Sequence, residues 1–500
     1  MLALDELIRT AGNVLLSPVK LAEMPSAQSC RRALVAGAKG GGAAAQAAEA
    51  LKAAAPGVEI EAACAEGRWL SLWWIRRRRY DVACLLLTGE GGARGKLLAV
   101  LSGAPTLVAI GTSGQWYQLQ RPPFRPLSLR WWARAVLSLL LCSLYLVLIE
   151  SVLLSDAIWR LLPMPAALPD PGPAAGRAVT FIVPTYNQRD LMDFCIPPLL
   201  SEAGREHQVL VVDDASTDAT AEHVRQAYRR VKLLRLEDNQ GFAGAVRAGV
   251  AAVDTPLFAL INSDVEVRPG FLDKILPHFG KDDVFAVCAR IQLPDGSQVE
   301  TGNVAPSFSG ILEPHHLPPA KAGPILFAGG ASSVFHKARY QALGGLDTIY
   351  HPFYWEDIDL GYRAWRRGWR SVFEPAASVL HQRRAAIGAH YGDAYADEIF
   401  LRNAIIFVWK NVRDRELLSR HLVYVCARVT REVLGGGAGM CRAVLRALPR
   451  FPRALFARWQ CRRRGDLPDR DILAAADPRR EEGATPSLPR GRPKPDGGAA

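Results

Sequence analysis

The stretch Val209–Asp218 reads VLVVDDASTD, and it decides the fold. Its four consecutive apolar residues predict a strand that is buried on both faces, as strands of parallel sheets are. Two aspartates follow directly, where the buried strand gives way to a polar turn, and a helical stretch over 219–230 comes next. A strand, a polar turn and a helix in this order predict one unit of an α/β domain with a parallel sheet.

The same pattern recurs on both sides of this stretch. The further pairs of strand and turn are Val179–Val183 with Pro184–Asn187, Lys232–Leu236 with Asn239–Gly244, and Leu257–Ile261 with Asn262–Asp264. Ligands of open parallel sheets bind outside the carboxyl ends of the strands. We therefore expect the polar side chains at these ends to converge on one cleft. They are those of Asp213, Asp214, Asn239 and Asp264.

Three carboxylates lie within four residues at the start of a predicted helix, at Glu356, Asp357 and Asp359. Adjacent carboxylates repel each other, which raises the pKa of one of them toward the value that suits a general base. The alternative is that these charges only complement the dipole of the helix. Both interpretations remain open at this point.

Length and composition limit the class of protein. The chain has 500 residues, 49% of them apolar and 22% charged, which is typical of two to four folded domains. These values exclude wholesale disorder, a collagen-like fibre and a polytopic membrane protein. Lys and Arg number 61 and Asp and Glu 49, a net charge of +12 that suits an anionic membrane surface or a phosphorylated substrate. It does not by itself indicate nucleic acid.

The cysteines indicate a reducing compartment. The nine cysteines are scattered, and no two have the C-x-x-C spacing of a zinc site or a clustered disulfide framework. Free thiols in a reducing cytosol are therefore expected. The N-terminus carries acids early and lacks a basic region, so it does not resemble a secretory signal.

Residues 1–120 are expected to form a small α/β, Rossmann-like domain of unknown role. Apolar segments alternate with helix-like ones, which predicts a parallel sheet. The strand candidates are Ala33–Ala36, Val58–Ile60, Val82–Leu87 and Thr106–Ile110. The turn Gly40–Gly42 before a helix could hold an anion, although a turn without a ligand is the simpler interpretation. Gly91–Lys96 fails the spacing of a phosphate loop, and no strand precedes G-x-G-x-x-G, which disfavours a pyridine-nucleotide enzyme.

Residues 133–154 form the most apolar segment and are expected to be a membrane helix. Ala135–Ile149 carry no charge, and Glu150 follows. The segment barely reaches the length of about 20 residues that crosses a bilayer. Trp131, Trp132, Arg130 and Arg134 flank one end as interfacial anchors do. A spanning helix is favoured, and an in-plane or re-entrant helix and a buried core helix are the alternatives.

The rest of the chain divides by composition. Residues 161–176 are a linker rich in Pro and Ala, and the chemistry lies in a domain over 177–412. Residues 413–465 are expected to be helical and basic, either as an amphipathic element on a membrane or as solvated helices. Apolar residues nearly vanish from Asp466 onward, so 466–500 are expected to be a disordered tail.

These motifs together resemble the family 2 glycosyltransferases, which have the GT-A fold. The resemblance covers about residues 178–412, and the motifs stand in the order of the family. They are Ile182–Asn187, Val212–Asp218, Asn239–Gly244, Asn262–Asp264, Gly344–Asp347, and Glu356–Asp357 with Asp359 and Arg363. Within the family the chain is most similar to the bacterial rhamnosyltransferase-type branch, as Val379–His381 and Arg402–Asn403 also indicate.

The resemblance implies that a sugar moves, with inversion, from a nucleotide diphosphate donor to a hydroxyl of a lipid-linked or polysaccharide acceptor. The leaving diphosphate needs a divalent cation, Mg²⁺ or Mn²⁺. The family pattern makes Asp264 the metal-binding carboxylate of its D-x-D motif and His381 a further ligand. Asp357 would be the catalytic base, with Glu356 as the second choice.

The resemblance also implies a set of residues that bind the donor. Asp214 would bind the base or ribose, with Thr185 and Asn239 shaping that pocket, and the glycines would let the backbone approach the sugar. The full set is Pro184, Thr185, Tyr186, Asn187, Asp213, Asp214, Asn239, Gly241, Asn262, Ser263, Gly329, Gly330 and Arg363.

One residue departs from the family pattern. Asn262 stands where the D-x-D motif begins with Asp, so it keeps a carbonyl oxygen but lacks the charge. The affinity for the metal then rests on Asp264 and the donor phosphates. The alternative is a non-catalytic, nucleotide-sugar-binding membrane scaffold with Asn262 as the lesion. The intact pair Glu356–Asp357 argues against it.

The charges around the apolar segment conflict with the location of the substrate. Basic residues precede the helix and a mixed pair follows it, so the positive-inside rule puts the N-terminal domain in the cytosol and the transferase domain outside. The residues before it are Arg121, Arg125, Arg130 and Arg134, and those after it are Asp156 and Arg160. Nucleotide sugars are cytosolic. Free cysteines on both sides favour a monotopic or re-entrant helix, with the catalytic domain facing the cytoplasm at the inner membrane. Proteolysis of sealed vesicles is expected to find both domains on one face.

Overall fold

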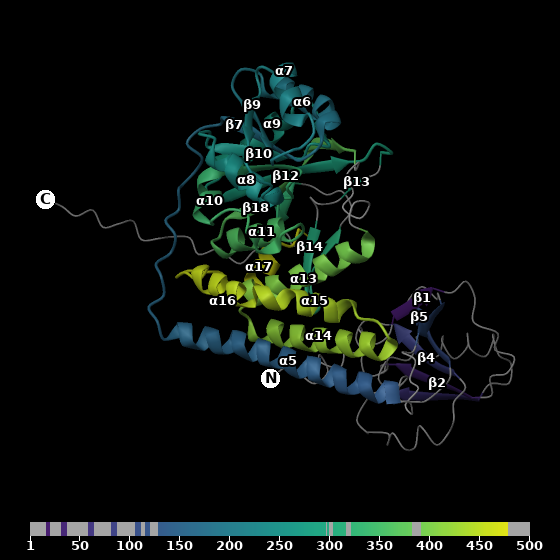
Figure 1. The fold of residues 1–500 in the computed structure, drawn as a ribbon. Helices are drawn as coiled ribbons and strands as arrows, with labels where there is room; N and C mark the ends of the chain where they lie inside the picture. The colour runs from purple at the N-terminus through teal and green to yellow at the C-terminus, as the bar shows by residue number, and fades with distance from the viewer. Residues whose placement is uncertain are drawn as a thin grey trace. The chain divides into compact units, whose positions relative to one another are not determined.

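The structure is a computed structural model of the chain. It describes residues 129–478 except 297, 300–303, 317–321 and 383–391, and it describes the backbone of six strands before residue 129. The chain divides into two compact units. One consists of Met1–Glu150 with Arg415–Arg442, and the other of Ser151–Asp414 with Ala443–Ala500. Figure 1 traces the elements of both.

The N-terminal strands of the first unit form one six-stranded sheet in the order β1-β6-β5-β4-β2-β3. They are β1 (Ser17–Lys20), β2 (Arg32–Gly37), β3 (Glu59–Cys64), β4 (Val82–Leu87), β5 (Thr106–Gly111) and β6 (Trp116–Gln120). The four expected strands pair in parallel, and β6 and β1 extend the sheet in antiparallel fashion. The turns at 40–42 and 91–96 lie outside the described residues.

Two long helices belong to this unit in whole or in part. Helix α5 (Leu129–Arg160) extends beyond the apolar segment 133–154 at both ends, and α14 (Arg415–Gly435) runs antiparallel to its first part. Ser138 Oγ lies 2.9 Å from Thr430 Oγ1, and the Tyr145 hydroxyl lies 2.5 Å from His421 Nε2. One stripe of α5 is therefore covered by α14.

The second unit contains a large mixed sheet. One half has four parallel strands in the order β10-β7-β8-β9. These are β7 (Val179–Thr185), β8 (Gln208–Asp213), β9 (Lys232–Arg235) and β10 (Leu257–Ile261). They are the strands that the recurring strand–turn–helix pattern predicted.

The other half of the sheet corrects the expectation of a mostly parallel sheet. The order β11-β18-β12-β17 continues from β10, and only β12 and β18 are parallel. The strands are β11 (Val265–Val267), β12 (Val284–Gln292), β17 (Ser332–His336) and β18 (Arg370–His381), with β13 (Gln298–Val299) and β16 (Gly323–Ile325) at the side. Strands β14 (Val304–Phe308) and β15 (Leu312–His316) form a separate hairpin. The regular helical crossover that enforces parallel pairing ends after β10.

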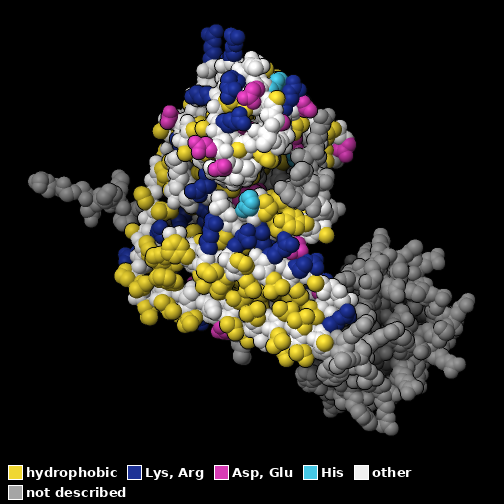
Figure 2. All heavy atoms as spheres, in the orientation of Figure 1, with side chains coloured by type: hydrophobic (Ala, Val, Ile, Leu, Met, Phe, Trp, Pro, Cys, Tyr) yellow, Lys and Arg dark blue, Asp and Glu magenta, His cyan; other side chains and the backbone are white. Residues whose placement is uncertain are grey.

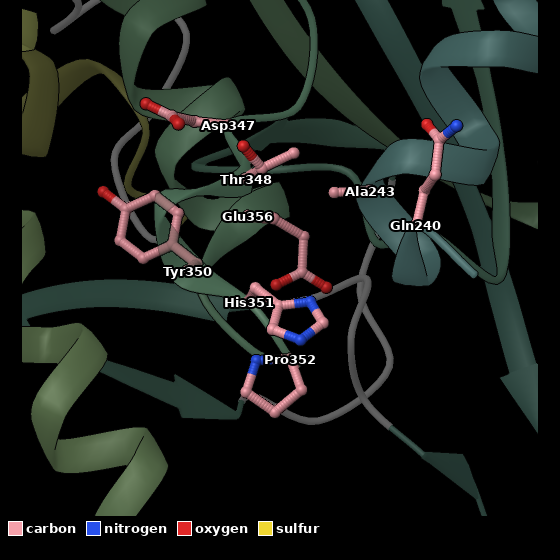
Figure 3. A pocket seen from close by; sticks show the side chains of 8 residues that line it. All are labelled: Gln240, Ala243, Asp347, Thr348, Tyr350, His351, Pro352 and Glu356. Carbon is pink, nitrogen blue, oxygen red and sulfur yellow. The ribbon is translucent and has the colours of Figure 1, made fainter. Parts of the chain in front are cut away.

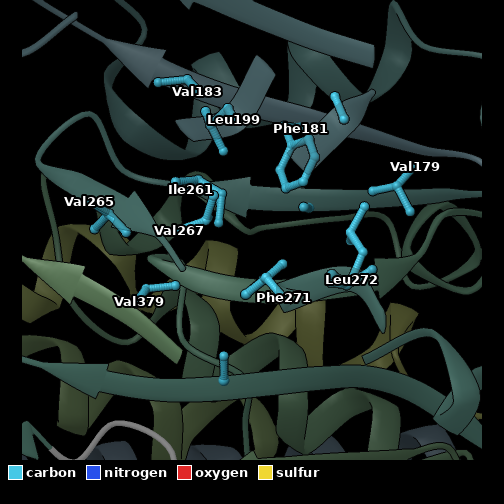
Figure 4. Close-up of a cluster of buried hydrophobic side chains, with 14 of the residues drawn as sticks. Val179, Phe181, Val183, Leu199, Ile261, Val265, Val267, Phe271, Leu272 and Val379 are labelled. Carbon is cyan, nitrogen blue, oxygen red and sulfur yellow. The ribbon is translucent and has the colours of Figure 1, made fainter. Parts of the chain in front are cut away.

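Helices cover both faces of the sheet. One face packs on α6 (Arg189–Ala203), α7 (Thr220–Ala227) and α9 (Phe271–Ile275), which leads into the 3₁₀ helix η1 (Leu276–Gly280). The other face packs on α8 (Gly241–Ala251), α10 (Lys337–Ala342) and α11 (Glu356–Arg366). Alternate residues of β7 serve the two cores, with Phe181 on the first (Figure 4) and Ile182 on the second. This alternation fits a strand buried on both sides.

The C-terminal part is helical and packs against the domain that contains the mixed sheet. It contains α13 (Asp393–Asn411), α15 (Gly439–Ala447), the 3₁₀ helix η3 (Leu448–Arg450), α16 (Phe451–Gln460) and α17 (Asp469–Ala475). Helix α17 corrects the expectation of disorder from residue 466 onward. Asp469 is buried, forms an ion pair with Arg366 and accepts a hydrogen bond of 2.7 Å from the Tyr362 hydroxyl. A single acid with buried partners orders this segment, which composition does not reveal.

Candidate active site

The loops after β7, β8 and β10 are joined by polar side chains. Asn187, in a left-handed conformation with φ 52°, accepts a hydrogen bond of 2.8 Å from the backbone N of Thr217 through Oδ1. Its own backbone N donates to Ser216 Oγ over 2.9 Å. Gln188 Oε1, in the same loop, accepts a hydrogen bond from Ser263 Oγ. The carboxyl ends of three strands therefore meet, as the topology predicted.

The loop after β9 joins them through Asp214. The buried carboxylate of Asp214 accepts a hydrogen bond of 2.8 Å from the backbone N of Gln240, and burial raises its pKa. Asn239 Nδ2 donates to the carbonyl of Asp214, and its Oδ1 accepts from the backbone N of Gly241. Gly241 has φ +69°, and a Cβ there would lie 3.0 Å from Nδ1 of His351. A side chain at 241 would thus be both strained and crowded.

Asp264 and His381 are brought together by strand pairing. Val265 at the start of β11 pairs with His381 at the end of β18. This register leaves His381 Nε2 3.1 Å from Asp264 Oδ2. Among the described residues, no group of three His, Cys, Asp or Glu side chains gathers around a common point as a metal site would.

A third possible metal ligand nevertheless lies on the same turn. The side-chain Oδ1 of Asn262 is buried and has no hydrogen-bond partner within the described part of the chain. A carboxylate, an imidazole and an unsatisfied amide oxygen form a donor set that suits Mg²⁺ or Mn²⁺, if phosphate oxygens supply the remaining ligands. The substitution in the D-x-D pattern therefore leaves a group that can still coordinate a cation.

The pair Glu356–Asp357 follows a backbone segment with unusual dihedral angles. Tyr354 and Trp355 both have positive φ, 71° and 79°. Such residues persist where the surroundings hold them in place, and they cluster at functional sites. Asn403 supplies that support, because its Nδ2 lies 2.9 Å from three carbonyl oxygens of this loop, including that of Tyr354, which share its two hydrogens. The loop thus presents both carboxylates in a defined position.

The two carboxylates differ in their pKa. Burial raises the pKa of Glu356 to about 8, and the charge of Asp357 raises it further in the same direction. Burial also raises the pKa of Asp357, to about 6, while the hydrogen bond from the backbone N of Ile358 opposes that shift. Asp357 therefore ionises first, and at neutral pH it is a carboxylate beside a protonated Glu356.

Asp357 lies near the carboxyl end of β10. Burial raises the pKa of the Cys288 thiol, and the charge of Asp357 adds to that shift. Cys288 Sγ is 3.5 Å from Ser332 Oγ, and Ser332 pairs with Ile261 across the sheet. Ile261 directly precedes the turn Asn262–Asp264. Asp357 and the turn Asn262–Asp264 are therefore both linked to this part of the sheet, through Cys288 and Ser332.

A small open pocket lies between the start of α8 and the loop before α11, and it is lined by Glu356 and not by Asp357. Figure 3 shows the imidazole of His351 and the carboxylate of Glu356 directed into it. Its lining consists of Gln240, Ala243, Asp347, Thr348, Tyr350, His351, Pro352 and Glu356. Neither His351 nor Gln240 was among the predicted site residues: His351 belongs to no motif, and Gln240 lies within the motif Asn239–Gly244 without a predicted role of its own.

Arg363 has a different surrounding from the one the resemblance implied. Its Nε bonds Asp359 over 2.7 Å, and its two terminal nitrogens donate to the carbonyls of Leu343 and Gly345. Lys410 Nζ contacts Asp359 as well, over 2.8 Å, and Asp347 over 2.7 Å. These contacts make Arg363 part of a buried charge network that supports the loop 343–347. Lys410 was not predicted to be part of this network, because it lies far from these acids along the chain.

The remaining expected donor residues lie along the same edge. Thr185 and Asp213 are buried, Tyr186 is exposed, and Pro184 pairs with Val212. The Gly329 carbonyl accepts a hydrogen bond of 2.6 Å from Ser333 Oγ. A Cβ at Gly330 would lie 2.9 Å from Phe242, so the absence of a side chain there allows α8 to pack closely. Close packing of protein, not only approach to a ligand, therefore accounts for this glycine.

The comparison with known families matches residues 180–343 to the model described as glycosyl transferase family 2. The chain is 27% identical over 283 residues to the N-acetylglucosaminyl-diphospho-decaprenol L-rhamnosyltransferase of Mycobacterium tuberculosis, covering 48% of this chain and 90% of that protein. It is 29% identical over 227 residues to the pre-mycofactocin glycosyltransferase of the same organism, covering 44% and 47%.

Two solved structures are also similar. One is the mannosyltransferase PcManGT from Pyrobaculum calidifontis in complex with GDP-Man and Mn²⁺, with a TM-score of 0.39 and 16% identity over 65% of this chain and 97% of that one. The other is GalNAc-T7 with UDP, GalNAc and Mn²⁺, with a TM-score of 0.39 and 15% identity over 47% and 48%.

Proposed function

We propose that the chain, a family 2 glycosyltransferase similar to the rhamnosyltransferase-type branch, transfers a sugar with inversion to a lipid-linked or polysaccharide acceptor. The donor is a nucleotide diphosphate sugar. The observation that carries the proposal is that Asp214, the pair Asp264–His381 and Asp357 all approach the carboxyl edge of one sheet. One edge then serves donor binding, metal binding and proton transfer.

The donor side follows from the first three loops. Asp214 and Asn239 bind the base or ribose, and Thr185 shapes that pocket. Asp264, His381 and the amide oxygen of Asn262 would hold Mg²⁺ or Mn²⁺. When bound, the cation neutralises charge on the diphosphate that leaves the sugar. The side chain of Asn262 provides an oxygen without a further negative charge.

The acceptor side follows from the carboxylate pair. Asp357 is the first of the two to ionise, so it takes the proton from the acceptor hydroxyl. Attack from the face opposite the leaving diphosphate inverts the anomeric carbon. Glu356 keeps its proton near neutral pH and lies in the pocket, where it can donate a hydrogen bond to a sugar oxygen. Its role in the proposal is to orient the sugar.

Association with a membrane is supported by the surface of α5. Residues 133–160 contain a window with a mean hydropathy of 2.4, of which only 28% is buried. Figure 2 shows hydrophobic side chains gathered along this helix. Leu139, Leu140 and Val147 are each at least 60% exposed. This face would bury its apolar surface in a bilayer.

The orientation that we propose for α5 is in the plane of the membrane. Its partner α14 carries Arg420, Arg428, Arg431 and Glu432 along the stretch that accompanies α5. If α5 crossed the bilayer, these charges would enter the hydrocarbon with it, at about 2.5–3.5 kcal/mol each. A helix that lies in the interface avoids this penalty and keeps the catalytic edge on the cytoplasmic side.

The test is calorimetric binding of UDP, dTDP and GDP to the full chain in detergent, with and without Mn²⁺. We expect one nucleotide to bind in a metal-dependent manner, and Asp264→Ala to weaken binding by roughly 10-fold to 100-fold. Arg464→Ala, which removes an exposed charge at the end of α16, is the control. Binding that is equally tight without metal, or unaffected in Asp264→Ala, would refute the metal-assisted mechanism.

A further inference from the structure

Gln188 connects two loops of the candidate site that follow different strands. It lies in the loop after β7, and its Oε1 accepts a hydrogen bond from Ser263 Oγ, 75 positions later in the chain. Thr185 Oγ1 lies 3.5 Å from the same oxygen. One amide oxygen therefore joins a residue of the expected nucleotide pocket to the middle residue of the turn Asn262–Asp264.

The side chain of Gln188 does not serve its own helix. Gln188 is the residue that precedes the first turn of α6, where Ser, Thr, Asp and Asn commonly cap the backbone through their side chains. Within α6, which the structure describes throughout, the Gln188 side chain caps no backbone N–H. Its amide extends to another element instead. Replacing it should therefore alter the site more than it alters the stability of the helix.

Helix α6 holds the turn at a second point. Cys195 lies two helical turns after Gln188, and thus on the same face of α6. Its buried Sγ donates to the carbonyl of Asn262 over 3.6 Å. Helix α6 also packs on β11, which follows the turn directly. The turn is therefore held from α6 on one side, while His381 contacts Asp264 from β18 on the other.

The residue that Gln188 holds lies between two expected metal ligands. Asp264 supplies a carboxylate, and Asn262 supplies a buried Oδ1 that has no hydrogen-bond partner in the described part of the chain. Ligand atoms that are already in place bind a cation with a smaller loss of conformational freedom. Side chains that orient metal ligands from behind affect metal affinity for this reason. The contact between Gln188 and Ser263 has the position of such a support.

The loop that carries Gln188 is also tied to the loop after β8. The backbone N of Gln188 donates to Thr220 Oγ1 over 3.2 Å, and the neighbouring Asn187 accepts from the backbone N of Thr217 over 2.8 Å. A nucleotide bound between these loops would fix Gln188, and with it Ser263. Ser263 would be fixed in the same way when the turn holds a cation. Each ligand should then favour the binding of the other.

We propose that Gln188 is a positioning residue that couples binding of the nucleotide to binding of the divalent cation, through its hydrogen bond with Ser263. The inference rests on the proposed function and adds a residue outside the predicted set. Gln188 itself touches neither the cation nor the reacting atoms. It acts on Asn262 and Asp264 through the residue between them.

The experiment measures calorimetric binding of UDP, dTDP and GDP to the full chain in detergent, once with Mn²⁺ and once with EDTA. In the unaltered chain, Mn²⁺ should strengthen binding of one nucleotide. Gln188→Met keeps the length of the side chain without the amide oxygen, so it should reduce this enhancement about tenfold and leave the affinity in EDTA unchanged. Gln188→Glu keeps an acceptor oxygen and should retain the enhancement. Gln226→Met, at an exposed position on α7, is the matched control and should change neither affinity.

A second pair of variants tests the route through Ser263. Ser263→Ala removes the hydroxyl that donates to Gln188 and should also reduce the enhancement by Mn²⁺. In a chain that already carries Ser263→Ala, Gln188→Met should cause no further loss, because the hydrogen bond that it would remove is already absent. A further loss of the same size would show that Gln188 acts through another contact.

The outcomes separate this inference from the proposed function. An equal loss with Mn²⁺ and with EDTA would assign Gln188 to the nucleotide loop alone, and an unchanged enhancement in Gln188→Met would remove its role. Either result overturns the inference and leaves the proposed function intact. If Mn²⁺ does not strengthen nucleotide binding to the unaltered chain, the metal-assisted mechanism fails, and the inference about Gln188 fails with it.

Discussion

The proposed donor side and the proposed acceptor side of the site are constructed differently. The proposed donor side consists of loops that follow β7, β8, β9 and β10, and neutral groups such as Asn187 and Asn239 connect them. The proposed acceptor side is the segment 347–363, which is held by charged and amide side chains from α13, η3 and α16. Loops at strand ends are positioned by the sheet itself. A segment between strands and helices is not positioned by the sheet, so it depends on side chains from other parts of the chain. Most of those side chains here are charged.

The largest expected effect separates the chemistry from the binding. Asp357→Asn should lower kcat by about 10²–10⁴-fold, because it removes the proton acceptor, and leave nucleotide affinity unchanged. Glu356→Gln, which imitates a protonated Glu, should lower kcat by less than about tenfold. Initial rates and nucleotide titration of both variants provide the measurement. The reverse order of effects would make Glu356 the base and would move the chemistry into the pocket.

An intermediate effect tests whether the acceptor loop depends on its partners. Asn403→Ala removes the amide donor of the Phe353 and Tyr354 carbonyls, while that of Tyr350 keeps a hydrogen bond from Arg402, and this should lower the free energy of unfolding by about 1–3 kcal/mol. It should also lower kcat more than it changes nucleotide affinity, because the support of Glu356 is lost. Denaturant unfolding and kinetics measure both. The exposed Gln460→Ala on α16 is the control, and an equal loss there would contradict a specific role of Asn403.

The smallest effect concerns the pH profile. The pKa of Asp357 is raised from its ordinary 3.8 to about 6, so the carboxylate that accepts the proton is lost as the pH falls through that value. The kcat/KM should therefore fall about tenfold per pH unit below it. Glu356→Gln should leave this acid limb in place, because burial causes most of the shift of Asp357. A limb that moves by more than about one unit would show that the two groups titrate as a strongly coupled pair.

The sequence was informative where structure depends on neighbours along the chain. Buried strands are apolar runs, and the polar residues behind them must lie at one edge of a parallel sheet. This rule predicted from the sequence that Asp214, Asn239 and Asp264 lie at that edge. Three carboxylates within four residues pointed to Glu356 and Asp357, and the family resemblance gave them roles. The match of residues 180–343 to a glycosyl transferase family 2 model confirms the resemblance. The sequence did not predict the contacts of Arg363, which donates hydrogen bonds to the carbonyls of Leu343 and Gly345.

Predictions from average composition and pattern were wrong where a few specific contacts decide the structure. The tail after residue 466 is polar on average. Asp469 nevertheless forms an ion pair with Arg366, 103 positions earlier in the chain, and lies in a helix. The sheet was expected to be mostly parallel, because the early strands have helical crossovers. The later strands return through irregular connections and pair in both senses. Neither outcome can be derived from local averages.

The sequence by itself determined the early strands of the catalytic domain, the polar edge behind them and the exceptional apolarity of residues 133–154. These are local properties, since apolar runs and turns depend on a few successive residues. The family resemblance had already implied that Asp264 and His381 lie together. Only the tertiary structure decided that Lys410 joins Asp347 to Asp359 and that Arg450 and Arg453 bond the loop 347–351. The physical reason is that the energy of an ion pair depends on the distance between its charges in space. The packing of the folded chain sets that distance, and the order of residues along the chain does not.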